Sequence, residues 1–154
     1  MFRKNVLLAM DKYMKKLLLL LMLSTSAYAD IPKEAIRTTD MKDICTTLTS
    51  TVRNVPQSLK KKVYIRDKGD LSKTKENEVD HRIALSSGGS NDINNLKLQS
   101  YFGKCNAHHK DVLEVRIHSL ICKQKMAVTV AQDILYNQWE KGYKAYIDPK
   151  GCNN

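Results

Sequence analysis

The 154-residue sequence lacks an apolar run long enough to cross a membrane. Its longest run, residues 17–23, follows two lysines and precedes small residues that end at Ala29. A membrane-spanning helix needs roughly 20 apolar residues, whereas a basic start, a short apolar centre and a small-residue cleavage site are typical of a secretory signal. We therefore expect residues 1–29 to be a signal peptide. Met14 could itself be the first residue of the protein, because the segment from Met14 onward is a complete signal. A permanent N-terminal anchor is the alternative.

The sequence also lacks closely spaced cysteine pairs of the C-x-x-C kind, which zinc ribbons use. No cysteine follows Ala29 directly, so a lipid anchor at that point is not indicated. An even number of cysteines in an exported chain predicts two disulfides, for which three pairings exist. A zinc site is the alternative that the spacing disfavours. The cysteines are Cys45, Cys105, Cys122 and Cys152.

Acidic residues are few compared with basic ones. The chain has 26 Lys and Arg against 16 Asp and Glu, a formal net charge of +10. Residues 1–29 hold five of the basic and one of the acidic residues, so the mature part carries 21 against 15, or +6. A basic excess favours polyanionic partners, of which nucleic acid and an acidic envelope surface are examples, while a solvated basic surface is the ordinary alternative. The length of residues 30–154 suits a single domain.

One stretch combines residue types that suit metal-assisted hydrolysis. Asp80 and His81 are adjacent, a turn with Gly88-Gly89 follows, and Asn95 and a histidine pair come later. A carboxylate and an imidazole can hold a divalent cation, and a second imidazole can take a proton from water. Phosphodiester hydrolysis needs both functions. The alternative is an ordinary hydrogen-bonded Asp–His pair at a strand end.

In this order, these residues resemble an HNH (ββα-metal) nuclease. The similarity covers roughly residues 44–146 and points to a group of exported bacterial HNH proteins. It implies an α+β fold in which a ββα-metal hairpin–helix unit, about residues 76–122, packs against flanking helices that include one at about 130–146. It also implies the disulfides Cys45–Cys122 and Cys105–Cys152. Outside the motif the resemblance is carried by Arg53-Asn54-Val55-Pro56, Lys60, Val63-Tyr64, Lys110-Asp111, Leu113-Glu114, His118, Ala131-Gln132, Trp139 and Tyr143.

The resemblance also implies a role for each motif residue. His81 corresponds to the general base, with its imidazole free of the metal and facing solvent, and Asp80 corresponds to a metal ligand. Asn95 belongs to the catalytic set because it fixes the turn that orients His81. His108 corresponds to the second metal ligand, with His109 as the alternative. Magnesium is the expected ion, and a histidine ligand would also accept manganese, nickel or zinc.

Apolar spacing predicts the elements around this site. Short runs over 79–85 and 95–99 predict a loose β-hairpin, and the polar stretch 70–77 predicts a loop. Lys60-Lys61-Lys62 is expected to be the solvated side of a helix, with phosphate contact as the alternative. The Trp139 and Tyr143 stripe is expected to pack on the metal unit, with base stacking as the alternative. Helices are expected over about 40–54, 58–67, 106–122 and 130–146, with N-caps at Asp40 and Ser58 and a Thr129–Gln132 capping box.

These expectations describe an exported, metal-dependent HNH endonuclease, periplasmic or secreted, that hydrolyses phosphodiester bonds. DNA is preferred over RNA as the expected substrate, and little sequence preference is expected. The first alternative is a catalytically inactive nucleic-acid-binding protein on the same scaffold. The second is an envelope protein whose partner is another protein.

Overall fold

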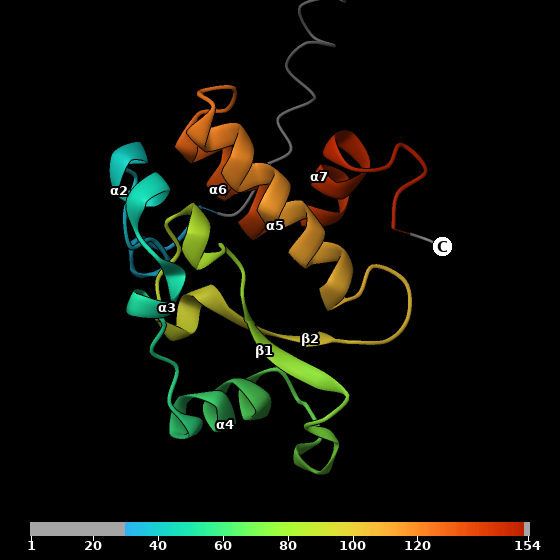
Figure 1. The fold of residues 1–154 in the computed structure, drawn as a ribbon. Helices are drawn as coiled ribbons and strands as arrows, with labels where there is room; N and C mark the ends of the chain where they lie inside the picture. The colour runs from blue at the N-terminus through green and yellow to red at the C-terminus, as the bar shows by residue number, and fades with distance from the viewer. Residues whose placement is uncertain (1–29, 153–154) are drawn as a thin grey trace, which may run out of the picture.

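A two-stranded antiparallel sheet lies in the middle of the computed structural model, which describes residues 30–152. Helix α4 (Gln57–Arg66) lies on one side of strands β1 (Asn77–His81) and β2 (Leu96–Ser100) (Figure 1). Helices α5 (Ala107–Cys122), α6 (Val128–Asn137) and α7 (Trp139–Tyr146) lie on the other side. The expected α+β fold, with a hairpin–helix unit and flanking helices, is confirmed. The expected signal peptide lies outside the described residues.

Strand β1 ends at His81, earlier than the expected residue 85, because the chain turns away from β2 there. Ile83 bonds to the side chain of Asn95 instead of to a neighbouring strand, at 2.8 Å for its N–H and 3.0 Å for its carbonyl. The connection contains two short 3-10 helices, Leu85–Ser87 and Ile93–Asn95. Gly88 has φ +86°, and a Cβ on Gly89 would lie 1.9 Å from the Ile83 carbonyl oxygen, so both glycines are required by the turn.

The helix expected over 40–54 is two helices, α2 (Met41–Thr46) and α3 (Thr49–Val52). Asp40 is the N-cap of α2, as expected, and accepts a hydrogen bond from the Lys42 N–H at 2.9 Å. The single helix is wrong because Thr47 has extended backbone angles and its hydroxyl donates to Asp43 Oδ1 at 2.6 Å. Such local threonine bonds compete with continuation of a helix.

Helix α4 begins one residue before the predicted cap Ser58 and has Pro56 at its N-cap position. Proline fits there because its fixed φ suits a helix start. The helix ends at Arg66, and Lys68, not the following glycine, takes the left-handed conformation with φ +56°. The expected loop at 70–77 contains a single short 3-10 turn, Leu71–Lys73.

The helix expected over 130–146 is also divided, by Gln138, whose φ of −152° leaves the helical range between α6 and α7. The Thr129–Gln132 capping box is wrong. Helix α6 starts after Ala127, and buried Gln132 donates instead to the carbonyls of Thr38 at 2.9 Å and Ser87 at 3.1 Å. The break lets α7 fold back closely onto α6.

The core lies between α5, α6 and α2. The expected stripe of α5 is buried, and Trp139 and Tyr143 of α7 pack against it, so the expected core role of these two residues is confirmed. Tyr146, also predicted to continue this stripe, is 37% exposed and lies outside the core. Disulfides join Cys45 to Cys122 and Cys105 to Cys152, the same pairs that the resemblance implied. Within residues 30–152, no helix is long and apolar enough to cross a membrane. The main cluster consists of Ile44, Ala84, Leu113, Ile117, Ile121, Ala131, Ile134 and Leu135.

Candidate functional site

His81, the expected general base, lies at the end of β1 and is only 3% exposed. The expectation that its imidazole faces solvent is therefore wrong. Adjacent positions of a strand point to opposite faces, so the His81 ring and the Asp80 carboxylate point in different directions, as the sequence predicted. Ring atom Nε2 of His81 lies 3.1 Å from Oδ1 of Asn91.

Asn91 determines which ring nitrogen of His81 carries the proton. Its Nδ2 donates to the Val52 carbonyl at 2.7 Å, and its Oδ1 accepts the Asn54 N–H at 3.1 Å, which fixes the orientation of the amide. Since Oδ1 can only accept, Nε2 of neutral His81 must be the donor, and Nδ1 keeps the lone pair. Sequence reasoning did not include Asn91, because its partner Val52 lies 39 residues upstream.

The environment keeps this imidazole uncharged at neutral pH. Burial lowers the pKa of His81 below its ordinary value of 6.5, because the charged form is less well solvated in the interior. The hydrogen bond to Asn91 acts in the opposite direction, and the positive charge of Arg53 lowers the pKa further. A neutral imidazole with a free lone pair is the form that can accept a proton.

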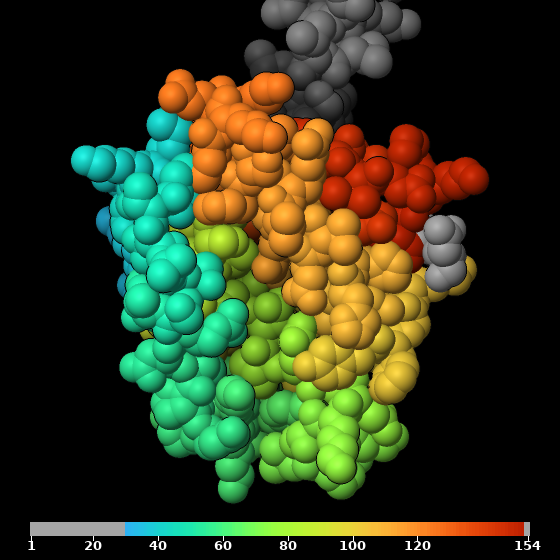
Figure 2. Space-filling model, in the orientation of Figure 1, coloured from blue at the N-terminus to red at the C-terminus, as the bar shows by residue number. Residues whose placement is uncertain are grey.

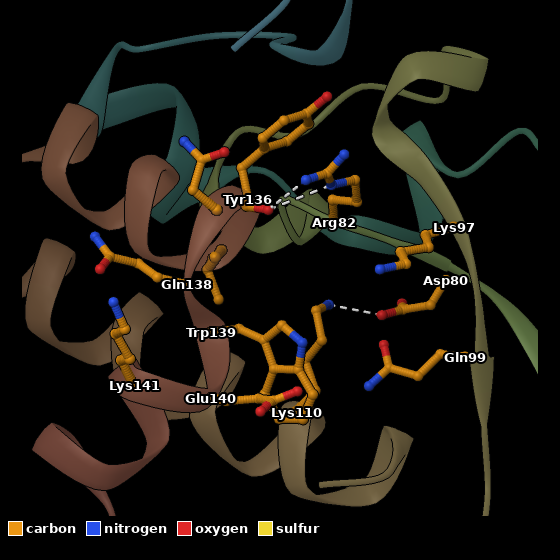
Figure 3. Close-up of a pocket in the computed structure, with 12 residues that line it drawn as sticks. Asp80, Arg82, Lys97, Gln99, Lys110, Tyr136, Gln138, Trp139, Glu140 and Lys141 are labelled. Carbon is orange, nitrogen blue, oxygen red and sulfur yellow. Dashed lines mark hydrogen bonds and ion pairs between the residues drawn. The ribbon is translucent and has the colours of Figure 1, made fainter. Parts of the chain in front are cut away.

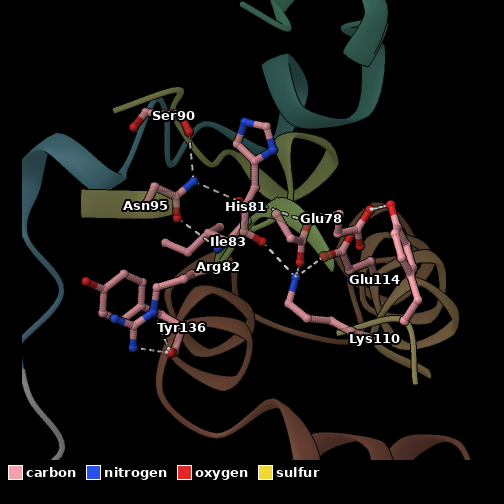
Figure 4. A network of polar contacts seen from close by, with 11 residues as sticks. Glu78, His81, Arg82, Ile83, Ser90, Asn95, Lys110, Glu114 and Tyr136 are labelled. Atoms are coloured by element: carbon pink, nitrogen blue, oxygen red, sulfur yellow. Dashed lines mark hydrogen bonds and ion pairs between the residues drawn. The ribbon is translucent and has the colours of Figure 1, made fainter. Parts of the chain in front are cut away.

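On the other face of the hairpin, Lys110 of α5 holds β1 through two donated bonds and makes a third contact within its own helix. Its ammonium contacts Asp80 Oδ2 at 2.6 Å and the His81 carbonyl at 2.7 Å, and it forms an ion pair with Glu114 (Figures 3 and 4). The side chain of Lys110 is 3% exposed. Burial opposes its charge, but the carboxylates of Glu114 and Asp80 raise the pKa of Lys110 above its ordinary value. Burial also raises the pKa of Glu114, to about 7.

Asn95 is fully buried and holds the loop that follows β1. Besides both backbone groups of Ile83, it contacts the Ser90 carbonyl, to which Nδ2 donates at 2.8 Å (Figure 4). These bonds use both protons of the Asn95 amide, and its oxygen is buried against Ile83, so Asn95 shapes the turn beside His81 and is not exposed to a substrate.

The predicted metal ligands Asp80 and His108 have different surroundings. Each carboxylate oxygen of Asp80 accepts one hydrogen bond: Oδ1 from the His81 N–H at 2.7 Å, and Oδ2 from Lys110. About two lone pairs of the carboxylate are therefore left for a metal ion. His108 is exposed and stacks on Tyr101, with 5.5 Å between ring centroids. The alternative His109 has Nδ1 2.9 Å from Asn106 Oδ1 and lies edge-on to Tyr143.

In the described part of the chain, no three His, Cys, Asp or Glu side chains are arranged to hold a metal ion. Magnesium in particular needs few protein ligands, since it keeps several waters and binds through one or two carboxylates and the phosphates of a substrate. The carboxylate of Asp80 therefore suits such an ion chemically, although the ion would share Asp80 with Lys110.

A cavity of about 300 Å³ opens beside Asp80, between the hairpin and α7 (Figure 3). Arg82, one of its lining residues, donates to the Tyr136 carbonyl at 2.7 Å and lies 3.5 Å from the centre of the Tyr136 ring. Arg82 is thus occupied by the protein itself.

Asp80, His81 and Asn95 lie around one turn, Lys110 lies on the helix that follows, and all four fall within the segment that matches a known family. Residues 66–111 match the HNH endonuclease family. These residues, called the HNH segment below, contain β1, β2, the loop held by Asn95 and the first turn of α5, so the part of the chain that bears the candidate site is similar to HNH endonucleases. No curated protein and no solved structure matches the chain.

Proposed function

We propose that the protein is an exported endonuclease that hydrolyses phosphodiester bonds, with His81 as the general base. One observation carries this proposal: a buried histidine, whose Nδ1 has no hydrogen-bond partner among residues 30–152, stands at the end of β1 inside the HNH segment. Burial usually removes a histidine from chemistry, but within the described part of the chain Nε2 alone has a fixed partner, Asn91.

In the proposed reaction, His81 Nδ1 takes a proton from the water that attacks the phosphorus atom. Asn91 holds the ring through Nε2, so the imidazole keeps its direction while it becomes charged. Lys110 fixes the carbonyl of His81, and Asn95 fixes the backbone of Ile83 two residues later, and both bonds limit the movement of the His81 backbone.

We propose that Asp80 holds a divalent cation, with His108 as its second ligand and His109 as the alternative. When bound, such an ion would neutralise charge on the phosphate and on the leaving oxygen. Magnesium is the proposed ion. The oxygen donor of Asp80 suits magnesium or manganese, and a histidine ligand widens the choice to nickel and zinc.

We propose DNA ahead of RNA as the substrate, with little sequence preference. The basic excess of the mature part supports low specificity, because positive side chains bind phosphates of any sequence. Two disulfides support an oxidising compartment, periplasmic or extracellular. We also propose that residues 30–154 form a single domain.

Cleavage of plasmid DNA by the mature protein tests the proposal. We expect nicking and linearisation with magnesium or manganese, loss of activity with EDTA, and a decrease of about 10²–10⁴-fold for His81→Ala, the usual contribution of a general base. His118→Ala is the control, because it also removes an imidazole, a half-buried one that contacts the Ser86 carbonyl, and it should keep wild-type activity. DNA binding without cleavage, unaffected by EDTA, would instead support the inactive binding protein. Cleavage of an RNA of matched length tests the preference for DNA.

A further inference from the structure

A second, larger cleft lies on the α4 side of the hairpin. Its volume is about 650 Å³. Figure 2 shows the surface hollowed between the teal-to-green segment of α3 and α4 and the yellow segment that follows β2. One wall carries Arg53, Lys60 and Lys61, and the other carries Glu78 and Tyr101. We infer that this cleft binds the sugar–phosphate backbone of the nucleic-acid strand that leads to His81.

The cations of the cleft have no carboxylate partners. Among the described residues, none of Arg53, Lys60 and Lys61 forms an ion pair, whereas Arg37 and Arg66 each bond to a neighbouring aspartate. Several unpaired positive charges on one concave wall raise the local concentration of anions. Helix α4 contains no acidic residue that would weaken this effect.

The aromatic groups of the cleft are already occupied, so they do not offer a stacking platform for bases. Tyr64 is 5% exposed and donates its hydroxyl to the Asn77 carbonyl at 3.1 Å. Tyr101 donates its hydroxyl to Glu78 Oε2 at 3.1 Å, and its ring stacks on His108. The groups left for a ligand are mainly cationic, which favours phosphates over bases as the bound part.

The cleft is connected to the candidate site through Asn91. Asn91 bonds to the backbone on both sides of Arg53, to the Val52 carbonyl and the Asn54 N–H, and its Oδ1 also faces the His81 ring. A strand that follows the cations of α4 toward Arg53 therefore arrives next to His81. Among the described residues, Glu78 is the one carboxylate that lines the cleft, and it repels phosphates and so confines them to the α4 wall.

The inference rests on the proposed function, and its test separates the two. Binding of a fluorescent single-stranded DNA of mixed sequence, about 20 nucleotides long, is measured by anisotropy in EDTA over a salt series. For Lys60→Gln/Lys61→Gln we expect weaker binding and a salt slope of log K reduced by about 1.4, or about 0.7 for each lost phosphate contact. With metal, KM for cleavage should rise while kcat stays near the wild-type value.

The control is Lys123→Gln/Lys125→Gln, which removes the same charge from exposed lysines beyond the end of α5, far from α4 (Figure 1). Wild-type affinity and salt slope in Lys60→Gln/Lys61→Gln, beside normal cleavage, would overturn the inference and leave the proposed function intact. Lysine-dependent binding by a protein that cuts no substrate would support the cleft and refute the nuclease. Arg53→Gln gives a second variant, which should reduce the slope by about 0.7.

Discussion

The two faces of the β1–β2 hairpin use lysine in opposite ways. On the α5 face, Lys110 is buried, and its ammonium donates to Asp80, Glu114 and the His81 carbonyl. On the α4 face, Lys60 and Lys61 line an open cleft and have no acidic partner within the described residues. A paired buried charge fixes the backbone, whereas unpaired charges around a hollow are available to a ligand. Lysine thus stabilises the fold on the α5 face, whereas on the α4 face it is available to bind a ligand.

The strongest test of this comparison is Lys110→Met. Removal of the ammonium leaves the carboxylates of Asp80 and Glu114, whose side chains are 16% and 17% exposed, without a counter-charge. We expect a loss of about 3 kcal/mol in the free energy of unfolding, the lower end of the range for a broken buried ion pair because these carboxylates are partly hydrated, measured with urea. Adding Glu114→Gln should restore part of it. Lys123→Met, at an exposed position, is the control and should change stability by less than about 0.5 kcal/mol. A loss below about 1 kcal/mol in Lys110→Met would mean that Lys110 is not a structural residue.

The next largest effect is expected from Cys105→Ser/Cys152→Ser. This disulfide closes a separation of 47 residues and joins the chain just before α5 to its C-terminal segment. We expect a loss of about 2–4 kcal/mol and weaker cleavage, since His108 lies near Cys105. Thermal melting and plasmid cleavage are the measurements. Equal activity of the fully reduced and the oxidised wild type would show that the site does not depend on the cross-links.

Asn91→Ala tests the contact that joins His81 to the segment of Val52 and Asn54 beside the α4 cleft. The variant loses the bond that fixes the His81 tautomer, and we expect cleavage to decrease about tenfold, which corresponds to about 1.4 kcal/mol. Asn94→Ala changes a neighbouring exposed asparagine and should keep wild-type activity. A decrease of the same size in both variants would contradict the assigned role of Asn91.

The smallest effect concerns the pH dependence of cleavage. Because burial lowers the pKa of His81 below 6.5, the imidazole stays neutral down to a lower pH, and the acid limb of kcat/KM should have its midpoint below 6.5. The same shift makes the stability decline as pH falls below about 6.5, since the unfolded chain then binds the proton more readily. His81→Ala should remove this part of the stability profile. An acid limb centred above 6.5 would argue against His81 as the base.

Local patterns predicted the parts of the fold that depend on neighbouring residues. The buried stripe of α5, the Asp40 cap and the hairpin follow from spacing and turn chemistry within short segments. The division of α6 and α7 could not be predicted this way, because Ala131, Leu135, Trp139 and Tyr143 continue at helical spacing across Gln138. The break depends on tertiary contact: a Cβ on Gly142 would lie 2.4 Å from the Ile134 side chain, so only glycine permits this approach.

The candidate site shows the same limit. Asp80, His81 and Asn95 form a recognisable order along the chain, and the structure places all three at one end of the hairpin. The sequence indicates Lys110 only through the resemblance. Its burial could not be predicted, because a lysine on a helix is ordinarily a surface residue. The role of Asn91 depends on Val52, which lies 39 residues away, and no local pattern connects the two. For the α4 lysines, the sequence offered phosphate contact only as an alternative, because the opposite wall of the cleft comes from other segments of the chain.

The two disulfides hold α5 at both ends, at Cys105 just before its first turn and at Cys122, its last residue. A helix anchored at only one end can rotate about its axis, and a slip of one residue turns every side chain by about 100°. Such a slip would carry the Lys110 ammonium away from Asp80 and release the strand that bears His81. With both ends cross-linked, the angular setting of the helix is preserved even when the surrounding loops fluctuate.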